Sequence, residues 1–517
     1  MQLFAKPLSA SLLFASMVFL YYGIDWLNYA RAGKLILTGA PTIGLLLALF
    51  YRRQSSRWLI TLYVLVTIVL FANLSFQAGL RDIFGVEQDE MMIMKSIFGT
   101  DAQESYEFVL QYKPYLLKHL LLFLVLSSSF LFLTIRPMNR SVTSISNKIL
   151  LVWIALFITG HLDKSIRKSN PLVFFPYFYM EYRQELNELH ALTDILKKNL
   201  DSNTLSQVKY TGEHRRNTVV WVIGESSTKY NWSLYGYERD TTPMIKRIEK
   251  SLLVFHEITA AAPITIPAFE KMMTQADKAH PDLWKKTPSI IQLAKQAGYH
   301  TYWISNHTTD AHSGITYIFA HQADDVVMTN KGKARGEGSY DESVFPAYQK
   351  ALRDPYEKKL IIVHLLGSHP AYNFRYPKSY AIFTGTYDDA VAKTLLDRGR
   401  AKWAVTFRNL YDNSIRYGDY VRYTLLSLLQ QSRESSHASW LYHPDHGEDV
   451  CHHNNFSGHN PQAKEQWEIP MLFWASKIPK IDTTQSYDLE NIGSSILGLL
   501  KIDARSYHAE KDIFLRR

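Results

Sequence analysis

Almost all the long apolar runs of this 517-residue chain lie before residue 166, and this uneven placement limits the fold more than any other feature. Five runs are long enough, or nearly so, for a helix to cross a hydrocarbon core about 30 Å thick. They cover residues 9–30, 35–51, 58–79, 115–135 and 148–166. The first run is too long for a cleaved signal peptide and further runs follow it, so we interpret it as a retained span. We therefore expect a transmembrane domain of five spans over residues 1–166.

The placement of lysine and arginine predicts how these spans are oriented, because cytoplasmic loops are rich in both residues. Basic residues precede the first span and lie between the second and third and between the fourth and fifth spans: Lys6, Arg52, Arg53, Arg57, Arg136, Arg140 and Lys148. The loop 80–114 is acidic and is expected outside, whereas a short turn predicted at 31–34 is basic and is an exception. Five spans that start in the cytoplasm place the C-terminal part in the periplasm of a Gram-negative cell.

The formal net charge of +9 does not indicate a nucleic-acid partner, because the chain has no basic stripe with interleaved aromatic residues. Much of the basic excess lies beside the apolar runs, which fits contact with anionic membrane lipids. Cys451 is the only cysteine, so the chain forms neither an intramolecular disulfide nor a thiolate metal cluster. We interpret Cys451 itself as an inert packed residue.

Residues 167–214 are expected to connect two domains. Residues 171–176 are aromatic and bounded by prolines, which indicates an interfacial linker. Residues 178–209 combine helical periodicity with many charges. This pattern predicts either a helix that bridges the membrane and the C-terminal domain or a plain solvated helix.

Residues 215–517 alternate short apolar runs, the first of them rich in β-branched residues, with helical stretches, which indicates an α/β domain with a mostly parallel central sheet. The predicted strands cover 218–223, 302–305, 360–364, 440–443 and 470–474. Ligands in such sheets bind at the carboxyl ends of the strands. The polar residues at or just after these ends are Glu225, Asn306, His307, His364, His369, Asp445 and His446. Their convergence predicts an active site at one edge of the sheet.

The adjacent Asp445 and His446 offer a carboxylate and an imidazole, which suit Zn²⁺ or another borderline divalent ion. Glu225, at another strand end, can add an oxygen ligand. Three later histidines are further candidates, namely His452, His453 and His459. An isolated Asp-His-Gly sequence often occurs by chance and a single histidine is often a surface or packed residue, so the prediction of a metal site depends on the whole group.

Thr265 is the candidate nucleophile, because it precedes an apolar run that predicts a helix. A hydroxyl at a helix N-terminus lies among free backbone N–H groups, where anions bind. A neighbouring divalent metal would lower the pKa of the hydroxyl and activate it for attack. The same position also suits a threonine that only caps the helix, and the local sequence alone favours the cap.

Four blocks of the C-terminal part carry a family resemblance. They are ESSTKYNWSLYGYERDTTP at 225–243, HLLGSH at 364–369 with RYP at 375–377, YDNSIRY at 411–417 and DHGE at 445–448. In this order, and after five predicted spans, they resemble the blocks of the bacterial phosphoethanolamine transferases in the sulfatase and alkaline phosphatase-like superfamily. The resemblance covers essentially the whole chain. It implies a zinc-dependent enzyme that moves phosphoethanolamine from phosphatidylethanolamine to lipopolysaccharide through a covalent threonine.

The resemblance also implies a role for each matching residue. The catalytic zinc would be bound by Glu225, Thr265, Asp445 and His446, and Thr265 would carry the phosphoethanolamine. His369 is implied in catalysis, in substrate binding or in a second zinc site. His459 is implied in metal and substrate binding, with His452 and His453 as rivals. The residues that resemble headgroup contacts of the family are Thr100, Glu104 and Thr308.

The chain departs from the family pattern at several positions. Lipid A-modifying relatives usually carry cysteines around the nucleophile, where this chain has Ala262 and Pro263. Ser96 and Pro444 replace an expected asparagine and serine, and an expected lysine is absent near Ala311. The cysteine-poor domain and the HLLGSH block look most like the branch that acts on heptose of the lipopolysaccharide core, so we favour that acceptor over lipid A.

Two alternatives stay open at the level of sequence. One is another enzyme of the superfamily, such as a phosphoglycerol transferase with a similar five-span arrangement. The other is a non-catalytic membrane-anchored binding protein that has kept the fold. The sequence leaves open the number of zinc ions and the oligomeric state.

Overall fold

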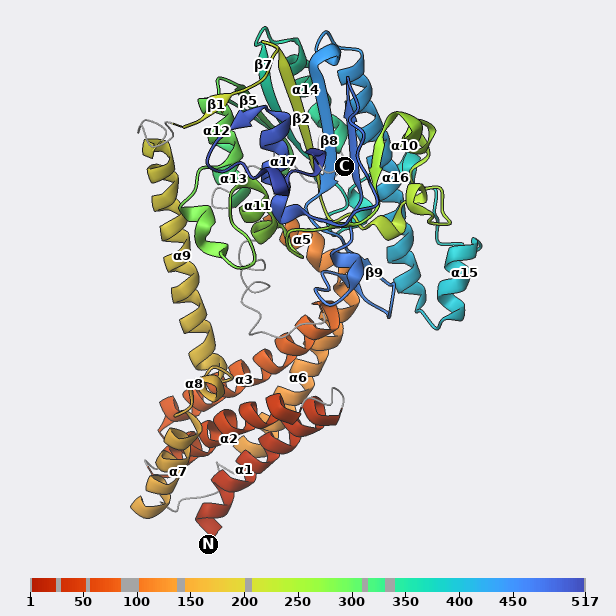
Figure 1. Cartoon of the computed structure of the whole chain (residues 1–517). Helices are drawn as coiled ribbons and strands as arrows, with labels where there is room; N and C mark the ends of the chain where they lie inside the picture. The colour runs from red at the N-terminus through yellow and green to blue at the C-terminus, as the bar shows by residue number, and fades with distance from the viewer. Residues whose placement is uncertain are drawn as a thin grey trace. The chain divides into compact units, whose positions relative to one another are not determined.

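The computed structural model describes residues 2–24, 29–52, 56–84, 102–136, 145–199, 207–308, 315–330 and 340–515 (Figure 1). The chain divides into two compact units. One consists of Met1–Met91 and Tyr112–Glu188, and the other of Met92–Gln111 and Leu189–Arg517. Each unit has a hydrophobic core of its own.

The first unit is helical. Its helices are α1 (Gln2–Val18) with the π-helical continuation η1 (Phe19–Ile24), α2 (Tyr29–Arg52), α3 (Arg57–Phe84), α6 (Lys113–Ile135), α7 (Asn147–Gly160), α8 (Lys164–Arg167) and the first part of α9 (Pro171–Asn199). Within the described residues, three stretches are long and apolar enough to cross a membrane, namely Tyr29–Arg52, Arg57–Asp82 and Lys113–Ile135. α7 is apolar but has 14 residues, and α1 has 17. The sequence prediction of five full-length spans is therefore supported for three of them.

Three predicted boundaries in this unit are wrong. The basic turn expected at 31–34 lies inside α2, because lysine and arginine are good helix formers. The fifth span was predicted to end at residue 166, but its helix, α7, ends at Gly160. Asp163 accepts a hydrogen bond from Ile166 N at 2.9 Å and begins a new helix, α8. The proline-bounded segment 171–176 forms the first turns of α9 rather than a linker. Pro171 is tolerated as the first residue of the helix because its missing N–H would have no partner there, whereas Pro176 lies inside the helix.

Close approach of small and large residues holds α2 against α7. A Cβ on Gly44 would lie 2.0 Å from the Trp153 ring, so only glycine fits at this position. Trp153 is buried in the same core as Phe14 and Phe130, whose ring centroids lie 6.3 Å apart. Membrane helices associate through such small-residue contacts, because burial of apolar surface brings little gain in lipid.

The second unit is built on a seven-stranded sheet with the order β3-β11-β8-β2-β7-β5-β6. Its strands are β2 (Asn217–Gly224), β3 (Leu253–Phe255), β5 (His300–Thr308), β6 (Asp325–Asn330), β7 (Lys358–His364), β8 (Ala438–Pro444) and β11 (Met471–Ala475). All five strands predicted from the sequence are present. The strands β3 and β6 were missed because one has three residues and the other is a partly exposed edge strand.

The sheet is mixed. β2 is parallel to β7 and β8, and β5 is parallel to β6 and β7. β11 runs antiparallel to both of its neighbours, β3 and β8. The parallel part brings the carboxyl ends of β8, β2, β7 and β5 to one edge, as the sequence predicted.

Helices cover both faces of this sheet and give two cores. Side chains of β2 alternate between them, with Trp221 and Ile223 in one core and Val220 and Val222 in the other. The first core includes α11 (Thr265–Met273), α12 (Ile290–Gln296), α13 (Ile315–Ala320) and α17 (Ile492–Leu499). The second includes α10 (Pro243–Arg247), α14 (Phe345–Arg353) and α16 (Lys402–Gln430). Burial on both faces explains the continuous apolar runs of the central strands.

The remaining elements of the second unit are short. They are α5 (Ala102–Gln111), α15 (Ala390–Asp397) and the strand pairs β1–β13 (Lys209–Tyr210 and Ile502–Asp503), β9–β10 (Asp449–Val450 and Ser457–Gly458) and β4–β12 (Ile258–Thr259 and Tyr487–Asp488). β1 lies inside the segment expected to be a linker, where Lys209 pairs with Asp503. The sheet-bearing unit therefore begins before the boundary expected at residue 215, since it includes the chain from Leu189 onward.

Candidate metal centre

The register of the parallel strands brings the predicted polar residues together. Ile223 of β2 pairs with His364 of β7 and with His443 of β8. Glu225 therefore emerges beside the end of β7, and Asp445 emerges beside Glu225 on the other side. The backbone makes the same connection, because Asp445 N donates to Gly224 O at 3.1 Å.

Glu225, Asp445 and His446 form a compact group that could hold a metal ion. His446 Nε2 lies 3.3 Å from Glu225 Oε1 and 3.5 Å from Asp445 Oδ2. All three side chains are almost completely buried. Asp445 Oδ2 makes no hydrogen bond within the part of the chain that the structure describes. A buried carboxylate oxygen without a donor is costly, so this donor set fits a cation.

The electrostatics of the group point the same way. Burial and the charge of Glu225 raise the pKa of Asp445 well above its usual range. Burial alone would lower the pKa of His446, but Asp445 and Glu225 raise it to about 10. Burial would raise the pKa of Glu225, and the hydrogen bond and charge of His446 instead hold it well below its usual range. The protonated imidazole thus supplies the positive charge that a bound metal ion would supply.

Thr265 converges on the same point. Its Oγ1 lies 3.4 Å from Glu225 Oε2 and 3.4 Å from His446 Nε2. Thr265 is the first residue of α11, and the capping position is taken by Ile264, whose backbone is extended. The alternative that Thr265 only caps the helix is therefore wrong, and its hydroxyl instead faces the buried carboxylate and imidazole.

Other family blocks hold this loop in place. Tyr411 Oη donates to Ser226 O at 2.8 Å and accepts from Thr228 N at 3.0 Å. Arg239 Nη1 donates to Asp412 Oδ2 at 2.6 Å in a buried ion pair. These hydrogen bonds connect the block at 225–243 to the block at 411–417. They hold the backbone next to Glu225 in place and so position its carboxylate.

Gln466 is a positioning residue that the sequence did not reveal. Its Nε2 donates to Pro263 O at 2.7 Å and to Gly447 O at 2.8 Å. Gly447 O also lies 2.7 Å from His446 Nδ1, so that nitrogen carries the hydrogen and Nε2 faces the site. Gln466 therefore links the segment before Thr265 to the loop of His446. The sequence held no signal for it beyond its position shortly after the histidine-rich stretch.

Of the three rival histidines, His459 lies beside His446. The two rings have centroids 4.9 Å apart, and His459 Nδ1 lies 3.0 Å from Glu448 Oε2. His446, Glu448 and His459 form a further group of potential ligands. His452 instead contacts Asn231 and Asp449, and His453 contacts Glu465. The rivals His452 and His453 are thus engaged elsewhere, whereas the role of His459 stays a prediction.

His369 follows β7 in a partly buried position. Its Nδ1 is buried and has no hydrogen-bond partner among the described residues. Burial lowers the pKa of His369 to about 3, and the charge of Glu225 opposes this shift. Thr100 lies outside the described residues, as do the side chains of Glu104 and Thr308. The predicted substrate contacts of these residues stay predictions.

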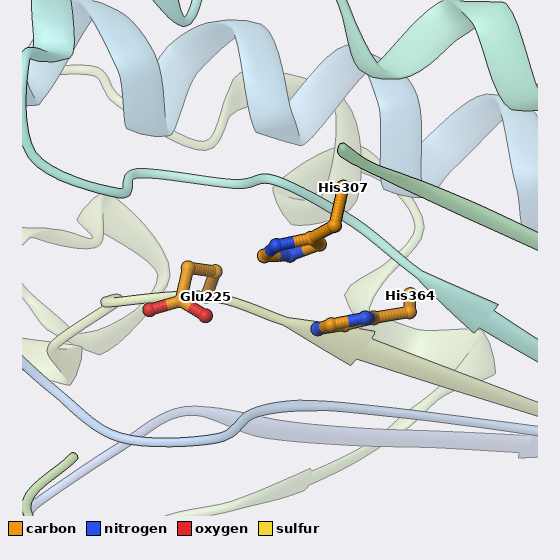
Figure 2. A group of neighbouring side chains, drawn as sticks. All are labelled: Glu225, His307 and His364. Carbon is orange, nitrogen blue, oxygen red and sulfur yellow. The ribbon is translucent and has the colours of Figure 1, made fainter. Parts of the chain in front are cut away.

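The structure shows a further group of potential metal ligands, which includes two histidines that the sequence analysis did not predict as ligands. Glu225, His307 and His364 lie together, and both rings point towards the Glu225 carboxylate (Figure 2). Burial lowers the pKa of His307 and of His364, so both imidazoles are neutral at pH 7. The signal was present in the sequence, since both histidines lie at predicted strand ends, but their distance depends on strand register.

Comparison with known proteins places this centre in a family. The sulfatase family model matches residues 217–502. The phosphoethanolamine transferase EptC of Escherichia coli K12 is 34% identical over 308 residues, which are 58% of this chain and 51% of that protein. CptA of Salmonella typhimurium LT2 is 32% identical over the same shares of the two chains. The chain thus spans about half the length of the curated relatives it matches.

Solved structures agree. The zinc complex of the C-terminal periplasmic domain of E. coli EptC is 30% identical, with a TM-score of 0.55 over 59% of this chain and 88% of that domain. The integral membrane protein EptA from Neisseria meningitidis shares the fold over 100% of this chain and 98% of its own, with a TM-score of 0.65 and 20% identity. The chain therefore belongs to the sulfatase family, in the branch that contains the phosphoethanolamine transferases.

Proposed function

We propose that the chain transfers phosphoethanolamine from phosphatidylethanolamine to lipopolysaccharide through a covalent intermediate on Thr265. The observation that carries this proposal is the position of Thr265 Oγ1, 3.4 Å from both Glu225 Oε2 and His446 Nε2 at the start of a helix. Relatives named phosphoethanolamine transferases support the choice of transferred group.

The surroundings of Thr265 suit nucleophilic attack on a phosphodiester. Oγ1 donates towards Glu225, so the carboxylate orients the hydroxyl and draws its proton away from the attacking lone pair. As the bond between Oγ1 and phosphorus forms, the bond to the diacylglycerol oxygen breaks. The threonine proton passes to the Glu225 carboxylate, and the departing diacylglycerol oxygen takes up a proton from water. In the second half-reaction an acceptor hydroxyl attacks the same phosphorus and releases its proton to solvent, while the bond between phosphorus and Oγ1 breaks and Oγ1 recovers its proton from Glu225.

Glu225, Asp445, His446 and Thr265 would hold a zinc ion in this reaction. The two buried carboxylates support that assignment, as does Asp445 Oδ2, which makes no hydrogen bond among the described residues. When bound, zinc would lower the pKa of the threonine hydroxyl and stabilise charge on the phosphoryl oxygens. Free N–H groups at the start of α11 add stabilisation of that charge. The chain itself provides the orientation and the exclusion of water.

His369 and His459 are proposed to serve the substrate. The low pKa of His369 keeps it neutral, so its unpartnered Nδ1 can accept a hydrogen bond from an acceptor hydroxyl and orient it. His459 lies beside His446 and pairs with Glu448 at 3.0 Å, which suits a contact to substrate or to a second ion. Thr100, Glu104 and Thr308 complete the proposed headgroup contacts.

The location and the acceptor are also part of the proposal. Apolar helices in the first unit support an inner-membrane protein, and the basic loops of the sequence support a periplasmic position for the sheet-bearing domain. A core heptose acceptor, in preference to lipid A, rests on the cysteine-poor domain and the HLLGSH block. Mass spectrometry of lipopolysaccharide from cells with and without the protein would locate the added group on the core or on lipid A.

Intact-mass spectrometry of the purified full chain tests the covalent step. After incubation with phosphatidylethanolamine, the wild type should gain one phosphoethanolamine adduct and Thr265→Ala none. Thr274→Ala is a matched control, because this threonine ends the same helix and its hydroxyl bonds Glu270 O. An adduct of equal yield on Thr265→Ala would refute the mechanism. A glycerophosphate adduct formed only with phosphatidylglycerol would assign the chain to phosphoglycerol transfer instead.

A further inference from the structure

Two imidazoles form a parallel pair next to Glu225 (Figure 2). The ring centroids of His307 and His364 are 3.9 Å apart, with an angle of 10° between the planes. His307 comes from the end of β5 and His364 from the end of β7, whose pairing of Ser305 with His364 aligns the two strands. One ligand atom from each ring and one from Glu225 lie within 4.8 Å of one another.

The hydrogen bonds of the pair leave one nitrogen of each ring available. His307 Nε2 lies 3.1 Å from Leu365 O, and since a carbonyl only accepts, this nitrogen carries the hydrogen and Nδ1 keeps its lone pair. His364 Nδ1 lies 3.4 Å from Ser305 Oγ, while its Nε2 is buried without a partner among the described residues. In Figure 2 the free end of the His364 ring points at the Glu225 carboxylate.

Burial makes this unpartnered nitrogen informative. The His364 side chain has no exposed surface, and its ring contacts Phe269 and Trp303 with centroid separations of 4.9 and 5.8 Å. An unpaired nitrogen in such a place is costly unless something binds it. An apolar shell around neutral imidazoles, with one carboxylate in reach, is the surrounding in which zinc ligands are commonly found.

We propose that Glu225, His307 and His364 bind a second divalent transition-metal ion, with zinc the best match. Two imidazoles and one carboxylate are a zinc-binding set that leaves one coordination position open. Because the lone pairs lie in the ring planes, one of the stacked rings must turn about its Cβ–Cγ bond for both to reach one ion. A carboxylate has two oxygens, so Glu225 can reach an ion of this set with one and the ion of Asp445 and His446 with the other. This site is separate from the group of His446, Glu448 and His459, with which it shares no residue.

Zinc counting by native mass spectrometry of the detergent-solubilised full chain tests this proposal independently of activity. After saturation with zinc and removal of the excess, His307→Gln and His364→Gln should each hold one ion fewer than the wild type. The double variant should also lack one ion and not two, because both histidines serve the same ion. His443→Gln is the control, since this equally buried histidine accepts from Trp221 Nε1 at 2.8 Å and should keep the wild-type number.

Three results would overturn the proposal. They are a wild-type zinc number in either single variant, a loss of two ions in the double variant, or an equal loss in His443→Gln. Should the variants fail to fold, zinc-edge anomalous diffraction from crystals of the wild type decides. A peak between Glu225 and the two rings supports the site, and its absence at saturating zinc refutes it.

Discussion

Glu225 lies between two ligand sets that differ in charge. On one side it meets Asp445 and His446, where two buried carboxylates face an imidazole whose pKa they raise to about 10. On the other side it meets His307 and His364, which are stacked and whose pKa values are lowered by burial. The first set contains two carboxylates, whereas the second set receives its only carboxylate from Glu225.

This difference indicates which set depends more on its ion. Buried carboxylates without a cation are strongly unfavourable, so the first set should bind zinc tightly. Loss of this zinc ion should destabilise the folded structure. The stacked imidazoles pack as neutral rings, so the second set should bind zinc more weakly and remain folded without it. Two sets of the same size can therefore differ in affinity because of charge, and Glu225 is the residue through which they are coupled.

The largest expected effect comes from removing the shared carboxylate. Glu225→Gln should lose both of these ions, whereas Asp445→Asn should lose only one. Both variants should lower phosphoethanolamine transfer by more than about 10³-fold, because metal stabilisation of the reacting group is worth several kcal/mol. Native mass spectrometry gives the ion number, and transfer from labelled phosphatidylethanolamine gives the rate.

Exposed Glu510→Gln is the control for this pair and should match the wild type in both readouts. A loss of one ion from Glu225→Gln would contradict the shared carboxylate, and the two sets would then be independent. Full transfer by either variant would contradict the assignment of the first set to catalysis.

Residue type at strand ends predicted the first set, and the reason is local. Glu225 follows the β-branched run of β2, and Asp445 and His446 follow the apolar and aromatic run of β8, so parallel pairing of the two strands brings them to one edge. The role of Thr265 was harder to predict, because a cap and a first helical residue differ by one position. Only the extended backbone of Ile264 distinguishes them.

Other parts of the molecule depend on distances that the sequence does not contain. The His307–His364 pair needs the register of β5 against β7, and Gln466 acts through contacts to Pro263 and Gly447 that are remote in sequence. In the first unit the apolar runs predicted where helices occur. Helix ends were less predictable, since a single side chain such as Asp163 can begin a new helix.

An intermediate effect is expected at Gln466, which acts on the first set only. Gln466→Ala should lower transfer by roughly 10- to 100-fold, as is usual when a residue that orients metal ligands is removed. The buried Pro263 carbonyl loses its donor and the Gly447 carbonyl keeps only His446 Nδ1, which should also weaken zinc binding at this set. Exposed Gln462→Ala is the matched control. Equal activity of the two variants would show that the loop of His446 needs no support from Gln466.

The smallest effect concerns Asp419, a buried carboxylate of α16 that lies outside both ligand sets. Backbone N–H groups, rather than a proposed metal ion, interact with its oxygens. It accepts hydrogen bonds from Met244 N at 2.7 Å and Ile245 N at 3.1 Å. Burial raises its pKa to about 6, although the charges of Arg422 and Arg416 oppose the shift. Asp419 therefore shows how burial changes the pKa of a carboxylate that accepts N–H donors and has no proposed metal ion.

The sign of its pH dependence follows from proton binding. Between about pH 4 and pH 6 the folded chain holds a proton on Asp419 that the unfolded chain has released, so stability should fall as pH rises through this range. Above pH 6 both states are ionised and the dependence ends. The loss is at most about 3 kcal/mol, because one pKa unit corresponds to about 1.4 kcal/mol. Asp419→Asn should flatten this part of the profile when melting temperatures of the zinc-saturated chain are compared from pH 4 to pH 7. Groups of the metal centre titrate in both proteins and cancel in the difference. Parallel profiles would mean that the N–H donors and the nearby arginine charges keep Asp419 ionised despite its burial. Asp445 Oδ2, which makes no hydrogen bond among the described residues, would then be the feature that sets the metal centre apart.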